Sequence, residues 1–190
     1  MISVSDNESM IVVKNSKFIC ILRHVNNISD IDNIFLEVKN KYKDATHYCY
    51  AYIINSISKC SDDGEPSGTA GLPMLDVLKK NNLNNVLCIV VRYFGKILLG
   101  ASGLVRAYSN AVTNCLSDHI VTLSSGYNVT IIFDYSNSKQ IDYLLKKSKI
   151  LNKKFEKNVI YNVNVTKDIY DDLVSCNLCS DVIINDDIYL

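Results

Sequence analysis

The sequence has little of what bends or ends regular structure, since its 190 residues contain only two prolines and seven glycines. Both prolines and six of the glycines lie between Gly64 and Gly103, and the remaining glycine is Gly126. Glycine permits positive φ, and proline fixes φ and ends ladders. We therefore expect regular helices and strands over most of the chain and one elaborate loop system in its middle. Functional residues concentrate on such loops.

Long apolar runs are also missing. The apolar run at 86–91 is far too short to cross a bilayer. The first eight residues contain no basic residue and no apolar run, so we expect no secretory signal. The seven cysteines are an odd number, which fits reduced thiols better than a disulfide framework. These features predict a soluble cytoplasmic protein.

The chain has no net charge, with 20 basic and 20 acidic residues, so no overall field attracts nucleic acid. Charge is nevertheless segregated, because residues 139–157 hold seven lysines and residues 168–190 hold six aspartates and no basic residue. We take the lysines as a candidate nucleic-acid face, formed by Lys139, Lys146, Lys147, Lys149, Lys153, Lys154 and Lys157. The other interpretation is a solvated surface whose charges neutralise one another locally.

Periodicity predicts two domains of mixed α and β structure, at residues 1–122 and 127–190. In the first we expect strands at 9–14, 17–25, 47–55 and 85–94 and helices at 28–42, 71–81 and 102–117, with Ser102 as the N-cap of the last. In the second we expect strand 127–133, helix 137–147, strands 150–156 and 159–166, helix 167–176 and strand 181–189. That β-α-β-β-α-β order is ferredoxin-like.

The most unusual stretch is Ser61-Asp62-Asp63-Gly64-Glu65-Pro66, with three carboxylates in four residues. They repel one another unless a cation, an arginine or backbone N–H groups stabilise them. A solvated turn that caps the following helix is the alternative. The spacing does not fit a calcium loop, and we predict no metal and no cofactor.

Arginine is scarce, with only Arg23, Arg92 and Arg106. Arg92 ends an apolar strand and needs a partner there, which the acidic turn can supply. We predict that a carboxylate of Asp62, Asp63 or Glu65 lies within hydrogen-bonding reach of Arg92 or Arg106, or flanks the same cleft.

The loop 95–103 precedes a helix and is typical of an anion cradle, because N–H groups at a helix start are free. It is neither a Walker A loop nor G-x-G-x-x-G. Together with the acidic turn it predicts a binding cleft formed by Asp62, Asp63, Glu65, Ser67, Thr69, Arg92, Tyr93, Gly95, Lys96, Gly100, Ser102, Gly103 and Arg106.

Three weaker patterns have simpler explanations. His47 and Cys49 share a strand face and could pair as base and nucleophile, but we favour a core thiol beside a half-buried histidine. The tyrosines at 48, 50 and 52 could stack bases, and we favour packing for them. Cys176 and Cys179 form a lone C-x-x-C with no second pair of zinc ligands. We assign no catalytic residue.

Three stretches together resemble the signature of the YigZ/IMPACT family: residues 47–51 (HYCYA), 61–75 (SDDGEPSGTAGLPML) and 90–109 (VVRYFGKILLGASGLVRAYS). The resemblance covers about residues 14–120, and the tail from 127 is similar to the small ferredoxin-like domain of bacterial members. Lys96 and Ser102 depart from the family pattern, which has glycine at both positions.

The resemblance implies an N-terminal domain with the ribosomal protein S5 domain 2-like fold. It also implies a role in translation, since eukaryotic relatives interfere with the activation of a stress kinase that acts on initiation. We therefore expect a binding factor rather than an enzyme, with RNA, the ribosome or a translation-related protein as partner and no membrane. The alternative is an enzyme or sensor that binds a phosphorylated small molecule, a nucleotide or another small anion in the cleft.

Overall fold

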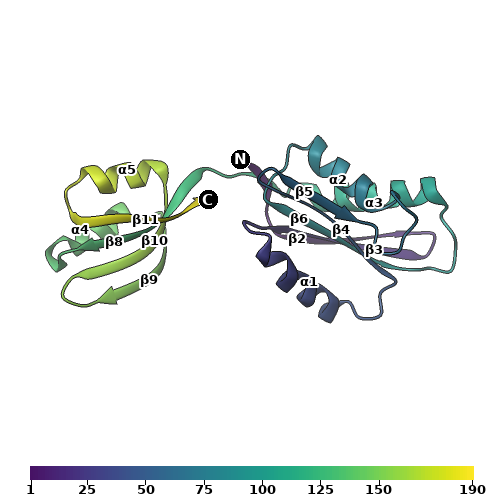
Figure 1. Cartoon of the computed structure of the whole chain (residues 1–190), viewed down its shortest axis with the longest axis horizontal. Helices are drawn as coiled ribbons and strands as arrows, with labels where there is room; N and C mark the ends of the chain where they lie inside the picture. Colours follow the sequence, from purple (N-terminus) through teal and green to yellow (C-terminus); the bar gives the residue numbers. More distant parts are fainter. The chain divides into compact units, whose positions relative to one another are not determined.

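The computed structural model describes all 190 residues, which form two compact units of mixed α and β structure (Figure 1). One unit is Ile2–Thr122, and the other is Leu123–Leu190 together with Met1. No helix has the length and apolar character needed to cross a lipid bilayer.

The N-terminal unit is built on a five-stranded sheet of order β2-β3-β6-β4-β5, in which every pair of neighbours is antiparallel. Its strands are β2 (Asn7–Val13), β3 (Ser16–His24), β4 (His47–Ile54), β5 (Ile57–Ser61) and β6 (Val86–Tyr93). Its helices are α1 (Ser29–Lys41), α2 (Gly71–Lys80) and α3 (Ala101–Leu116). The short strands β1 (Ile2–Val4) and β7 (Ile120–Thr122) pair with each other.

The helices cover both faces of this sheet, with α1 on one face and α2 and α3 on the other (Figure 1). Strand β6 lies at the centre, so alternate residues enter two cores: Cys88 and Val90 face α2 and α3, while Ile89 and Val91 face α1. A strand buried on both faces needs a continuous apolar run. Arg92 follows this run on the side of Val90.

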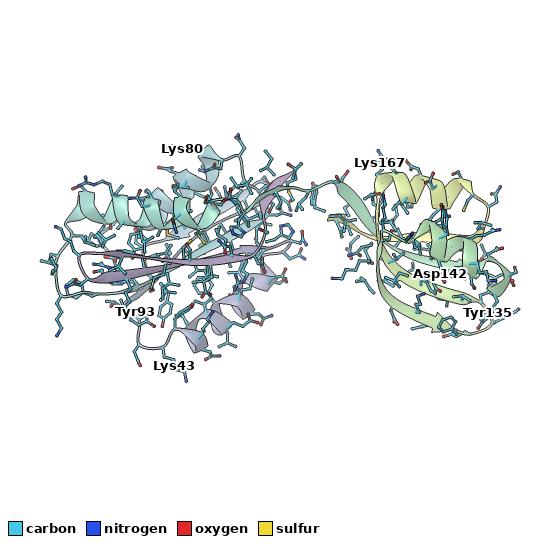
Figure 2. All side chains as sticks on the ribbon, turned by 180° about the vertical axis from the view of Figure 1, so that it is seen from behind. Lys43, Lys80, Tyr93, Tyr135, Asp142 and Lys167 are labelled. Atoms are coloured by element: carbon cyan, nitrogen blue, oxygen red, sulfur yellow. The ribbon has the colours of Figure 1, made fainter.

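The tyrosine-bearing face of β4 packs under α1, which confirms the packing interpretation. The ring of Tyr50 meets that of Phe35 edge-on, with centroids 5.1 Å apart. Figure 2 shows Tyr93 on the same side of the sheet, near Lys43, and the Tyr93 hydroxyl donates to the Lys43 carbonyl at 3.0 Å.

The predicted N-cap of α3 is wrong, and three short strands of the N-terminal unit are not predicted by the sequence pattern. Ser102 does not cap α3, which begins at Ala101 after Gly100 (φ 71°) and has no side-chain cap. Strand β5 was missed because it is a short, polar edge strand, and Ser61 ends it instead of opening the turn. Strands β1 and β7 were missed because three residues carry no recognisable periodicity.

The second unit contains the predicted β-α-β-β-α-β order, folded as one antiparallel sheet of order β11-β8-β10-β9. The elements are β8 (Ser125–Phe133), a 3₁₀ turn (Tyr135–Asn137), α4 (Ser138–Leu144), β9 (Lys149–Phe155), β10 (Val159–Thr166), α5 (Lys167–Ser175) and β11 (Cys179–Tyr189). Val129, Ile131, Phe133 and Tyr161 form its core with Ile141 of α4 and Leu173 of α5.

Candidate functional site

Asp62 turns towards the start of α2. Its carboxylate accepts hydrogen bonds from the backbone N–H groups of Gly68 (2.8 Å), Ala70 (2.9 Å) and Gly71 (2.8 Å). Burial acts to raise the pKa of this carboxyl, but the three N–H donors outweigh it and hold the pKa below its ordinary value. Asp62 therefore caps the start of α2, as in the alternative interpretation of the acidic turn.

Glu65 from the same turn points the other way, into the unit, and is only 8% exposed. Its Oε1 accepts from Arg92 Nη1 at 2.5 Å and from the Tyr108 hydroxyl at 2.8 Å. Burial raises the pKa of Tyr108, which keeps that hydroxyl protonated as a donor. The predicted contact between a turn carboxylate and Arg92 or Arg106 is confirmed for Glu65 and Arg92.

Arg92 is 5% exposed, and its guanidinium lies against the rings of Phe18 and Phe94, at 5.3 and 5.5 Å from their centroids. Its Nη2 donates to Ser16 Oγ at 3.4 Å. Its Nε is buried and has no hydrogen-bond partner. A buried donor without a partner costs about 1–3 kcal/mol. The Nε–H group of Arg92 is such an unsatisfied donor.

His47 stands beside this pair, with Nδ1 2.7 Å from the Asp63 carbonyl oxygen and Nε2 3.9 Å from Glu65 Oε1. A carbonyl oxygen only accepts, so Nδ1 carries a proton, and in that tautomer Nε2 is the acceptor nitrogen.

Cys49 is not a nucleophile partner for His47. Its Sγ lies 3.0 Å from the Asp62 carbonyl oxygen and 3.3 Å from the Tyr108 hydroxyl, to both of which it can donate. Burial raises the pKa of this thiol to about 12, although the hydrogen bond with Tyr108 acts to lower it. It stays protonated at neutral pH, which confirms the interpretation as a core thiol.

His47, Glu65 and Arg92 line one cavity of about 370 Å³ next to the start of α3. The other residues around it are Thr46, Pro66, Phe94, Leu98, Leu99, Gly100, Ala101 and Leu104. The first helical hydrogen bond of α3 runs from Leu104 N to Gly100 O at 2.9 Å. The N–H groups before it have no side-chain cap, and the positive end of the helix dipole is therefore open at the cavity.

Of the predicted cleft residues, Glu65, Arg92 and Gly100 line this cavity. The remaining ones do not: Asp62, Asp63, Ser67, Thr69, Tyr93, Gly95, Lys96, Ser102, Gly103 and Arg106. His47 also lines it, although its strand pattern favours only a half-buried histidine beside a core thiol. Tyr108 is not among the predicted cleft residues. Its spacing of four residues from Leu104, about one helical turn, was the available signal that both side chains face the sheet.

Two loop residues have conformational roles. A Cβ on Gly95 would lie 2.1 Å from the Asn15 carbonyl carbon, so only glycine fits there. Lys96 has φ 64°, a conformation that glycine adopts more readily than lysine.

The predicted lysine face of the second unit is divided by the strand register. Lys153 stands opposite Tyr161 on the helix side of the sheet. Its Nζ forms an ion pair with Asp142 of α4 at 3.1 Å, and Asp142 is labelled in Figure 2. Lys154 stands opposite Ile160, on the other face. Successive strand side chains point to opposite faces, so Lys153 and Lys154 do not share one face of the sheet.

Comparison with known proteins identifies the class. Residues 14–116 match the family model described as the Impact N-terminal domain. Because this match covers more than half of the chain, the protein belongs to the IMPACT family.

The relatives carry the same family name. The IMPACT family member YvyE of Bacillus subtilis is 47% identical over 113 residues, which cover 58% of this chain and 52% of YvyE. The IMPACT family member YigZ of Escherichia coli is 38% identical over 55% of this chain and 53% of YigZ. This chain thus matches about half the length of these relatives. A crystal structure of a hypothetical protein superposes over 97% of both chains with a TM-score of 0.61 and 28% identity.

Proposed function

We propose that this protein is a binding factor that regulates translation and that it acts by contacting a translation-related protein, free or on the ribosome. Membership in the IMPACT family supports the link to translation, because the family resemblance implies such a role. The observation that supports a protein contact is an exposed apolar loop beside the cavity.

We also propose the finer fold assignments. The N-terminal domain, residues 1–122, would be S5 domain 2-like, and the C-terminal domain, residues 127–190, would be ferredoxin-like. The strand order β11-β8-β10-β9 supports the second assignment.

The loop between β6 and α3 presents three apolar side chains to solvent. Phe94 is 43% exposed, Ile97 is 44% exposed and Leu98 is 82% exposed. Neighbouring exposed apolar side chains mark a protein contact more often than a nucleic-acid contact, which is dominated by phosphate-binding cations. We therefore place the contact with the partner at residues 94–98.

Leu98→Ser is expected to weaken cosedimentation with purified ribosomes by about tenfold, because a central apolar contact of an interface contributes more than about 1 kcal/mol. The same variant should lose the effect of the wild-type chain on reporter synthesis in a cell-free translation system. Leu36→Ser is the matched control, since Leu36 is 61% exposed on α1, on the opposite side of the sheet.

Equal losses in both leucine variants would contradict the contact at 94–98. A wild-type chain that neither binds ribosomes nor alters reporter synthesis would overturn the translational role. Binding that falls steeply with salt and survives Leu98→Ser would assign the contact to RNA phosphates instead.

Arg106→Ala is expected to change the free energy of unfolding by no more than about 0.5 kcal/mol. Arg106 is exposed on α3, and its Nε donates only to the Ser102 carbonyl of the same helix, at 3.2 Å. We expect the variant to lose partner binding and Arg106→Lys to restore it in part, because lysine lacks the bidentate fork. Melting temperature and ribosome binding are measured side by side, and a variant that unfolds would contradict this prediction.

A further inference from the structure

The cavity beside α3 has an acceptor end and a donor end, which adjoin each other at the Glu65–Arg92 ion pair. The acceptor end consists of the Glu65 carboxylate and of His47 Nε2, 3.9 Å away, which is the acceptor nitrogen in the tautomer whose Nδ1–H donates to the Asp63 carbonyl. The donor end consists of the uncapped N–H groups at the start of α3 and of Arg92, whose buried Nε has no partner. A helix start attracts an oxyanion, and two converging acceptors attract an N–H or ammonium group.

The remaining walls of the cavity are apolar. They are formed by Phe94, Leu98, Leu99 and Leu104, and the cavity volume of about 370 Å³ lies within the range of small-molecule sites. Such walls suit a short hydrocarbon side chain.

We propose that this cavity binds a small zwitterion with an apolar side chain, which is the chemistry of a free apolar α-amino acid. The carboxylate lies at the α3 N-terminus beside Arg92, the ammonium group lies against His47 Nε2 and Glu65, and the side chain packs on Leu98, Leu99 and Leu104. This ligand site goes beyond the proposed translational function and does not depend on it.

The local charges favour a zwitterion over a simple anion. Glu65 and Arg92 already form an ion pair, so the cavity has no surplus positive side chain to balance a phosphate. Lys96 and Arg106 are exposed and do not line it. A molecule carrying both charges adds no net charge to the buried pair, whereas a bare anion would stand close to the Glu65 carboxylate.

The first experiment compares matched ligands on the full chain by thermal shift and calorimetry. L-Leucine and L-phenylalanine, at up to about 10 mM, are expected to raise the melting temperature, because a ligand that binds only the native state stabilises it by mass action. Leucine methyl ester lacks the negative charge and N-acetylleucine lacks the positive charge, so both are expected to give no shift. Inorganic phosphate tests whether an oxyanion alone is sufficient.

Ala101→Asp tests the donor end without weakening the fold. A carboxylate at the first position of α3 stabilises the helix dipole and repels a bound carboxylate. We expect the affinity for leucine to fall at least about tenfold while the melting temperature of the unliganded protein stays level or rises. Ser29→Asp is the matched control, because it places the same charge at the start of α1, on the other face of the sheet, and should leave leucine binding unchanged.

Four results would each overturn the proposal. They are an unchanged melting temperature with both amino acids, equal binding of the ester or the N-acetyl derivative, phosphate binding that competes with leucine, and an unchanged affinity for leucine in Ala101→Asp. A failure of ribosome binding would leave this site untouched, since the ligands are assayed on the isolated chain.

Discussion

Replacing Arg92 by alanine is expected to destabilise the N-terminal unit by about 3–5 kcal/mol, the cost of leaving a buried charge unpaired. The loss removes the 2.5 Å hydrogen bond to Glu65 and leaves that carboxylate with only the Tyr108 hydroxyl as donor. It also removes the guanidinium from between Phe18 and Phe94. Urea denaturation followed by far-UV circular dichroism measures the change. Because the chain forms two units, the transition of the N-terminal unit is fitted separately.

Lys41→Ala is the control for Arg92, because Lys41 also pairs with a glutamate, at 2.8 Å, but at the surface. Exposed ion pairs contribute about 0–1 kcal/mol, so the control should be mild. The double variant Glu65→Gln/Arg92→Met removes both charges and should be more stable than the single variant Arg92→Met, since no charge is left buried alone. A double variant as unstable as Arg92→Met would show that the unpaired charge does not determine the loss.

Replacing Asp62 by alanine is expected to cost about 2 kcal/mol, because it leaves three N–H groups at the start of α2 without their carboxylate. The backbone donors hold the folded-state pKa of Asp62 below its ordinary value of 3.8. The stabilisation is therefore present above the unfolded-state pKa and is lost as the pH falls through the lower folded-state pKa.

The difference in unfolding free energy between wild type and Asp62→Ala should thus be constant above about pH 5 and shrink at more acidic pH. Asp76→Ala is the matched control, since Asp76 lies on the exposed face of the same helix. A difference that grows on acidification would contradict the capping role.

Much of the framework could be predicted from local patterns. The apolar run of β6 and the helical spacing of Leu104, Tyr108 and Val112 predicted their elements to within a residue or two. The need of Arg92 for an anionic partner followed from its place at the end of a buried strand, because a buried guanidinium is costly unless it is paired.

Local patterns could not say which carboxylate of the turn would meet Arg92. Asp62 and Glu65 are three residues apart and have similar chemistry, but Gly64 and Gly68 adopt positive φ and turn the chain between and around them. One carboxylate therefore reaches the N–H groups of α2, and the other reaches the interior. His47 and Tyr108 join Glu65 only because α3 packs on the face of the sheet to which His47 of β4 points.

The sequence by itself determined the mixed α and β class, the order of the long elements and the central position of the loop system, because periodicity and glycine placement act over a few residues. The tertiary structure decided the capping role of Asp62, the pairing of Glu65 with Arg92 and the placement of Lys153 and Lys154 on opposite faces of a sheet. These depend on strand register and helix packing, in which a shift of one residue moves a side chain to the opposite face.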